Sequence, residues 1–222
     1  MAELLKTLKT PFFETIYLTF VPLLFSVIFG FMIGTLIFIT SSSSHVIEND
    51  NPIIKVIHIV SDWIVSIFRA IPYTILLIWL IPLAKLLTGK MLGATAALPS
   101  LIVSATPFFA RMVVVAFSEV DKGPIEASRA MGAGLFTIIF KVLLKESLPA
   151  IISSISITGI NLVSYTAMAG AVGAGGLGFT AYNSGLVRRN NEVFYSAVLL
   201  ILALVFIIQL IGDKASKAID KR

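Results

Sequence analysis

Few side chains in this sequence are suited to catalysis or metal binding. The chain contains no cysteine, and its two histidines, His45 and His58, lie thirteen residues apart. It also lacks the HExxH pattern of zinc peptidases, the GxSxG pattern of serine hydrolases and the GxxxxGK[ST] phosphate loop. We therefore expect no catalytic residue, no metal site and no cofactor site on this chain. If ATP drives the protein, another polypeptide must hydrolyse it.

Glycines near the end of the chain superficially resemble a dinucleotide-binding fingerprint. They are Gly173, Gly175, Gly176 and Gly178. That fingerprint follows a strand, and none is predicted before these residues. We interpret them instead as positions where backbones approach closely or hinge, because glycine has no side chain to prevent either.

One segment, residues 123–149, is polar and helix-forming in a chain otherwise built of apolar spans. Pro124 suits a first helical turn, and Gly132 is placed to end the helix about two turns later. Glu126 and Arg129 share a face, since residues three apart are neighbours on a helix. The other side chains keep the helix thin: Ala127, Ser128, Ala130 and Met131. We predict a plug for a groove on a partner protein, with a plain interfacial helix as the simpler alternative.

A polar stripe marks a later, otherwise apolar helix. Its members recur every three or four residues and so lie on one face: Ser154, Thr158, Asn161, Tyr165 and Met168. Such a stripe is unsuited to lipid. It could supply hydrogen bonds between helices, or it could line a translocation pathway that Tyr165 and Met168 close. The two interpretations are compatible, because a gate can close by packing the same residues across a symmetry axis.

The elements that carry these residues are membrane helices. The sequence is 57% hydrophobic and 13% charged, and its mean hydropathy is +0.97, which is too apolar for a soluble domain of this size. We predict an all-α polytopic protein in which residues 1–222 form one transmembrane domain. About 20 helical residues cross the hydrocarbon core. Charge-poor stretches therefore predict five spans, at about 15–44, 63–84, 91–110, 149–171 and 193–212.

Several features should shape these spans. Gly30 and Gly34 have the spacing of a close helix contact. Pro72 and Pro82 should bend or break the second span. Residues 130–140 are too few to cross and predict an interfacial helix. The run Gly170–Gly178 is too rich in glycine to favour a helix.

A polar loop is predicted after the first span. Residues 41–44 are all serine, and residues 48–52, which end in Asn51 and Pro52, have strong turn chemistry. Arg111 is expected at or near the inner end of the third span.

The distribution of charge predicts the topology. The net charge of +5 does not form one basic patch, so we expect no nucleic-acid partner. With residues 123–149 in the cytoplasm, 11 Lys and Arg residues lie inside and 6 outside, in agreement with the positive-inside rule. The N-terminus would then be outside and the C-terminus cytoplasmic. Arg69 is expected near one end of its span, and no acidic residue is expected deep in any span, which argues against an ion-coupled carrier. Five helices are few to enclose a path, so we expect a two-fold dimer.

Glu126-Ala127-Ser128 and Gly132 resemble the EAA loop, here about residues 119–148, of bacterial ABC importer permeases. This sequence departs from the pattern at Lys145, where proline is usual, and Pro149 follows four residues later. The segments Phe68–Pro72, Ala105–Arg111 and Ala169–Gly178 extend the resemblance to the methionine branch over nearly the whole chain.

The resemblance implies a homodimer in the cytoplasmic membrane. It implies two copies of a separate ATPase that bind ATP and Mg²⁺, and an extracytoplasmic methionine-binding protein. The cargo implied is L-methionine, with the D-isomer left open. Two alternatives remain at this point: a permease for another amino acid or small peptide, and a secondary carrier that needs no ATPase.

Overall fold

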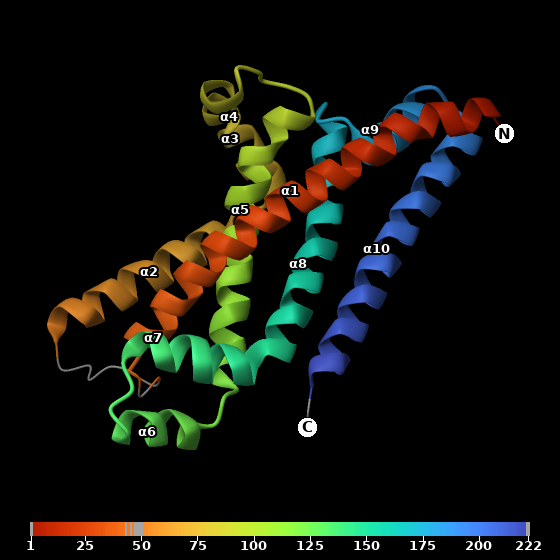
Figure 1. The fold of residues 1–222 in the computed structure, drawn as a ribbon. Helices are drawn as coiled ribbons and strands as arrows, with labels where there is room; N and C mark the ends of the chain where they lie inside the picture. Colours follow the sequence, from red (N-terminus) through yellow and green to blue (C-terminus); the bar gives the residue numbers. More distant parts are fainter. Residues whose placement is uncertain (1, 43, 45, 47–50, 221–222) are drawn as a thin grey trace.

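The computed structural model describes residues 2–42, 44, 46 and 51–220, and these form helices and turns without strands. In chain order the helices are α1 (Ala2–Thr40), α2 (Pro52–Ala70), α3 (Tyr73–Trp79), α4 (Ile81–Thr88), α5 (Ala94–Ser118), α6 (Lys122–Ala130), α7 (Leu135–Thr137), η1 (Ile138–Leu143), α8 (Leu144–Ala171), α9 (Gly176–Ala181), η2 (Tyr182–Val187) and α10 (Asn191–Ile219). The N-terminus, α3, α4 and α9 lie at one end, and α6 and the C-terminus lie at the other (Figure 1). We call the end with α6 the inner end.

The chain passes five times between these ends, as predicted: along α1, along α2 to α4, along α5, along α8 and along α10. By length and composition, three helices in the described part of the chain qualify as membrane spans: Lys6–Thr40, Ala94–Ser118 and Asn191–Ile219. The second passage is interrupted, and α8 carries the polar stripe. Both passages therefore give a weaker apolar signal than the other three.

Several helices are longer than the predicted spans. The helix α1 begins at Ala2 rather than residue 15, α5 continues to Ser118 rather than 110, and α10 continues to Ile219 rather than 212. Charged side chains mark where a helix leaves hydrocarbon, but they do not end it, because its backbone hydrogen bonds continue into water.

The predicted bounds of the second span, 63–84, are wrong. The helix α2 begins at Pro52, where Asn51 Oδ1 accepts a 2.9 Å hydrogen bond from the backbone N–H of Ile53. It ends at Ala70 because Pro72 forces Ile71 into an extended conformation, at φ −75° and ψ 122°. The break predicted at Pro72 is therefore confirmed.

Arg69 was expected near one end of this passage, but the structure does not place it there. Its neighbour Phe68 lines one cavity together with Ile102 and Thr106, and these residues are near the middle of α5. Arg69 therefore lies about halfway between the two ends of the molecule.

The predicted polar loop after the first span is only partly described. Residues 43, 45 and 47–50 lie outside the described residues, and so do the cytoplasmic charges predicted at Lys221 and Arg222. His45 is therefore one of the residues that the structure does not describe.

The close contact predicted at Gly30 and Gly34 is confirmed. A β-carbon on Gly30 would lie 2.9 Å from the carbonyl oxygen of Thr106, and one on Gly34 would lie 2.8 Å from Cβ of Val113. The absence of side chains thus lets α1 and α5 approach at backbone distance. Beyond this crossing Phe109 and Phe117 are fully buried, so the core of the inner half forms around α5.

At the inner end, α7, η1 and the first turns of α8 form one helical path that runs across the molecule before α8 turns toward the outer end (Figure 1). The predicted interfacial helix thus begins at Leu135 rather than residue 130, because Gly132 and Gly134 lie in the turn after α6. Lys145, which replaces the usual proline, continues the helix, and Pro149 lies inside α8 near this bend.

Candidate functional site

The short helix α6 projects at the inner end and buries one of its side chains, that of Ile125. Ile125 is 2% exposed and belongs to a buried cluster with Phe117, Ile138 and Leu143. The rest of the predicted plug faces outward: Glu126, Ala127, Arg129, Ala130, Met131 and Gly132 are exposed and Ser128 is half-buried. A single apolar anchor therefore fixes α6 to the body of the molecule and leaves its polar face available.

Gly132 ends α6 as the sequence predicts. Its φ of +78° lies in the left-handed region, which glycine enters without strain. Its N–H donates to the carbonyl oxygen of Arg129 at 2.9 Å, and the N–H of Ala133 donates to that of Ser128 at 3.0 Å. This pair of bonds is a Schellman motif, and it satisfies two of the carbonyls that the helix end leaves free.

The predicted polar stripe on α8 divides into two parts. Ser154 and Thr158 are buried in the subunit, and their hydroxyls donate to carbonyls of their own helix, those of Ala150 and Ser154. Both side chains are covered within the subunit, and among the residues that the structure describes neither donates a hydrogen bond to another helix. Each hydroxyl donates to the carbonyl oxygen four residues earlier in the same helix, as Ser and Thr hydroxyls commonly do.

The outer part of the stripe is more accessible. Asn161 is half-buried, and Tyr165 is half-buried with its ring stacked on Tyr73 of α3 at 4.7 Å between centroids. Met168 is 45% exposed. Ser164, which we did not predict, is also exposed on this side; its spacing of three from Asn161 and four from Met168 is the signal that could have identified it. The accessible face of α8 therefore runs along Asn161, Ser164 and Met168.

Near Met168 the glycine-rich run makes a tight crossing between α8 and α9. A β-carbon on Gly178 would lie 2.6 Å from the carbonyl oxygen of Ala167, and one on Gly170 would lie 2.8 Å from the carbonyl carbon of Gly178. Gly173 and Gly175 have φ values of +90° and +83° and form the turn between the two helices. The prediction of close backbone approach is confirmed.

The prediction that Gly170–Gly178 avoids helix is wrong at both ends of the run. Gly170 lies in α8, and Gly176 and Gly178 lie in α9. Two side chains of α1 hold the start of α9: Glu14 Oε2 accepts from the N–H of Gly176 at 2.7 Å, and Thr15 Oγ1 accepts from that of Leu177 at 2.8 Å. These partners are 162 residues away in sequence, so propensity within the run could not reveal them.

An acidic residue does lie on a helix that we treat as crossing the membrane. Asp62 is on α2 and pairs with Arg111 of α5 at 3.5 Å, and both side chains are partly exposed, at 39% and 43%. We missed it because the predicted span began one residue later, at Trp63. Arg111 was expected at the inner end of its span, but it lies seven residues before the end of α5.

Comparison with known proteins identifies the family. Residues 55–222 match the family model "binding-protein-dependent transport system inner membrane component". The methionine import system permease protein MetP of Bacillus subtilis is 51% identical over 168 residues, 76% of each chain. The probable D-methionine transport system permease protein MetI of Haemophilus influenzae is 38% identical over 213 residues, 96% of this chain and 97% of the relative.

A solved structure agrees over the whole length. It is described as an inward-facing conformation of the MetNI methionine ABC transporter, in a native crystal form, and it matches with a TM-score of 0.92 and 39% identity, covering 100% of both chains. An amino acid ABC transporter at 20% identity and TM-score 0.71 shares the fold. This chain therefore belongs to the family of binding-protein-dependent transport system inner membrane components, and it groups there with the methionine ABC transporter permeases.

Proposed function

We propose that this chain is the permease subunit of an ATP-driven importer that carries methionine across the cytoplasmic membrane. The whole chain acts as one transmembrane domain, and two copies form the path. Two copies of a separate ATPase bind ATP and Mg²⁺, and an extracytoplasmic binding protein delivers the amino acid. The observation that carries the proposal is the exposed helix α6, Schellman-capped and anchored by Ile125, in a chain similar to methionine permeases over its full length.

The proposed role of α6 is mechanical. Residues 126–132 insert into a groove of the ATPase and move with it when ATP binding draws the two ATPases together. Ile125 passes that motion to Ile138 and Leu143, and hence to the helical path that continues into α8. ATP binding turns the accessible faces of the two α8 helices outward to accept substrate, and hydrolysis returns them inward.

The proposed constriction of the path is formed by Met168, with Tyr165 behind it. Met168 is exposed on one subunit, so a second copy related by a two-fold axis can bring the two thioethers together. The crossing at Gly170 and Gly178 supports the backbone directly beyond it. Ser154 and Thr158 then serve as packing residues, while Gly173, Gly175 and Gly176 shape the turn that positions α9.

This mechanism sets the orientation in the membrane. With α6 in the cytoplasm, the C-terminus is cytoplasmic and the N-terminus is outside, because these lie at opposite ends of the molecule (Figure 1). Arg69 and Arg111 no longer count as inner-end charges, so 9 Lys and Arg residues remain inside against 6 outside. Lys and Arg residues are thus still more numerous on the cytoplasmic side, as the positive-inside rule requires.

Reconstitution tests the proposal. The permease, its cognate ATPase and its binding protein are placed in vesicles with ATP at the α6 side, and uptake of labelled methionine is measured. We expect uptake that needs ATP and the binding protein, and that unlabelled L-methionine abolishes; competition by the D-isomer measures stereoselectivity. Uptake driven by an ion gradient without ATP would overturn the proposal in favour of a secondary carrier, and preference for another amino acid would overturn the cargo.

A further inference from the structure

A second polar face, on α2, extends from the inner end to the middle of the molecule. Its members recur at intervals of three, four, four and three residues, which places them on one side of the helix: Lys55, His58, Asp62, Ser66 and Arg69. Most of the remaining residues of α2 are apolar and exposed, among them Trp63 at 65% and Ile67 at 52%, whereas Val65 is buried against α1 and α5. The helix α2 thus has one side suited to contact with lipid and one side whose polar and charged residues are costly to place in lipid.

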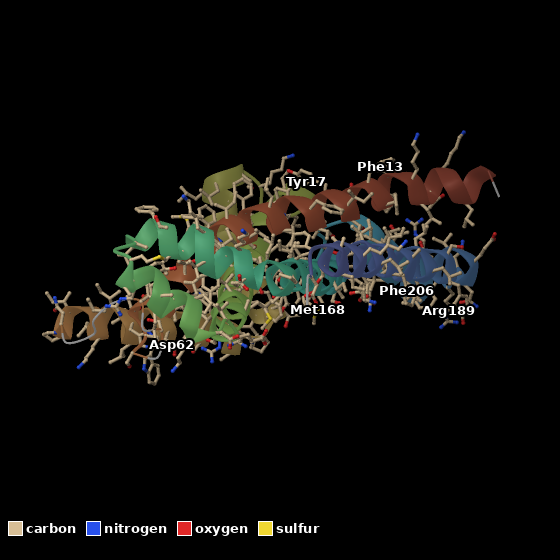
Figure 2. All side chains as sticks on the ribbon, turned by 60° about the horizontal axis from the view of Figure 1, so that its bottom comes forward. Phe13, Tyr17, Asp62, Met168, Arg189 and Phe206 are labelled. Atoms are coloured by element: carbon tan, nitrogen blue, oxygen red, sulfur yellow. The ribbon has the colours of Figure 1, made fainter. Side chains whose placement is uncertain are left out.

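Asp62, one member of this polar face, lies on the same side of the subunit as Met168 (Figure 2). In the view of Figure 2, Asp62 and Met168 lie along one edge, whereas Phe13 and Tyr17, which are 58% and 40% exposed on α1, lie along the opposite edge. Part of this face contacts the subunit itself, since His58 Nδ1 lies 3.1 Å from the carbonyl oxygen of Ile37 on α1. Asp62 reaches Arg111 of α5, and Tyr73, at the start of α3, stacks on Tyr165 of α8.

Arg69 is the deepest charge on this face. It lies beside the middle of α5, as its neighbour Phe68 indicates, and only four residues before Tyr73. The side chain is exposed, and no ion pair or hydrogen bond joins it to another of the described residues. A guanidinium at this depth is costly unless it meets water or an anion.

We propose that the polar face of α2 lines the inner half of the path and that Arg69 binds the carboxylate of the amino acid just inside the Met168 constriction. A guanidinium offers two parallel N–H donors that match a carboxylate. Every α-amino acid carries that group, so the site recognises the backbone of the cargo rather than its side chain. The inference rests on the proposed function, since it needs an amino acid in the path.

A lipid phosphate and the backbone carbonyls at the end of α2 could also attract Arg69. A lipid phosphate lies at the membrane surface, far from the middle of the span. The free carbonyls at the end of α2 attract a cation, but they would hold Arg69 whether or not an amino acid is present. The carboxylate proposal alone therefore predicts an effect that depends on the chemistry of the cargo.

Cysteine labelling tests the first half of the proposal, because the native chain contains no cysteine. The variants Ser66→Cys and Ile67→Cys differ by one position on α2 and by the side that they face. In the nucleotide-free complex in lipid nanodiscs, a charged, membrane-impermeant thiol reagent should label Ser66→Cys and fail to label Ile67→Cys. Equal labelling, or labelling of Ile67→Cys alone, would overturn the assignment of the face.

Protection of the same cysteine tests the carboxylate. Methionine in excess should slow labelling of Ser66→Cys, whereas methioninol, which lacks the carboxylate, should not. Adding Arg69→Gln should remove the protection by methionine while leaving the unprotected rate of labelling intact. Protection by methioninol, or protection that survives Arg69→Gln, would overturn the role of Arg69.

Transport gives the third measurement. Arg69→Gln should lower methionine uptake by about tenfold, the loss expected for one hydrogen-bonded charge, while assembly and ATP hydrolysis remain near wild type. Methionine uptake by Arg69→Lys should be intermediate, because lysine keeps the charge but lacks the two parallel N–H donors of the guanidinium. The control Lys90→Gln removes an exposed charge at the outer end, and its uptake should match wild type. If the wild-type complex carries no methionine, the proposed function fails; if it does and Arg69→Gln carries as much, only this inference fails.

Discussion

The molecule uses glycine in two opposite ways at its two ends. At Gly132, after α6, a β-carbon would meet nothing within 4 Å, but φ is +78°. At Gly178, in α9, the backbone is helical, but a β-carbon would lie 2.6 Å from the carbonyl oxygen of Ala167. The first position needs glycine for its conformation, and the second needs it for its lack of volume.

The difference distinguishes a loosely packed end from a tightly packed one. Around Gly132 the chain leaves open space, and Ile125 is the one buried residue of α6, which suits an element that is proposed to move with a partner. Around the crossing of α8 and α9 it removes all space, which suits the support of a constriction. Substitutions should therefore damage the two ends to different extents and in different measurements.

The largest effect is expected from Gly178→Val. The added side chain would collide with the backbone of α8 at Ala167, and a backbone cannot rotate away as a side chain can. We expect a loss of about 3 kcal/mol or more, at or above the usual cost of overpacking, and a large fall in the unfolding temperature of the purified complex. Gly134→Ala is the control, since a β-carbon there meets nothing within 4 Å and φ is −73°. Unchanged thermal stability of Gly178→Val would contradict the tight crossing.

Ile125→Ala should be next. Truncating a buried isoleucine costs about 2 to 5 kcal/mol, but here the loss should release α6 rather than unfold the membrane helices, because Ile125 is its one buried residue. We expect the permease to keep its fold and to lose the ATPase during co-purification. Leu86→Ala is the comparison, because Leu86 is 81% exposed on α4, at the end of the molecule opposite α6 (Figure 1). Global unfolding of Ile125→Ala would show that α6 is not a separately attached element.

The number of crossings and the existence of the short helix α6 could be predicted because their signals are local. Charge-poor stretches identify five passages, and Pro124 with Gly132 bounds a short helix in a polar segment. Gly30 and Gly34 also predicted their contact correctly, since that spacing places both on one face of α1.

The features that we missed depend on distance in sequence or on how a motif was interpreted. Asn51-Pro52 was taken for a turn, although an asparagine cap followed by proline also begins a helix; this hid Asp62 and the polar face of α2. The start of α9 could not be predicted at all, because its partners Glu14 and Thr15 lie on α1. The sequence could not show that Met168 is exposed and Thr158 buried, because both fit the same helical periodicity.

Glu14→Ala tests what holds the start of α9 at the tightly packed end. It removes a carboxylate that accepts from the N–H of Gly176 at 2.7 Å, and hydrogen bonds to charged groups are worth about 1.5 to 3 kcal/mol. We expect a moderate fall in the unfolding temperature and faster proteolysis of the turn at residues 172–175. Thr15→Val should have a smaller effect, because it removes a neutral acceptor at Leu177. If Glu14→Ala leaves the turn as resistant as wild type, the carboxylate does not hold α9.

The smallest effect on stability, but a specific one on coupling, is expected from Gly132→Ala. A left-handed φ costs a residue with a β-carbon about 1 to 2 kcal/mol, and no collision adds to it. The strain can be relieved by unwinding the last turn of α6, which would break the bonds to Arg129 and Ser128. Uptake per ATP hydrolysed should therefore fall while thermal stability stays close to that of Gly134→Ala. Normal coupling in Gly132→Ala would mean that the end of α6 does not transmit force, and the contrast between the two ends would then be one of packing alone.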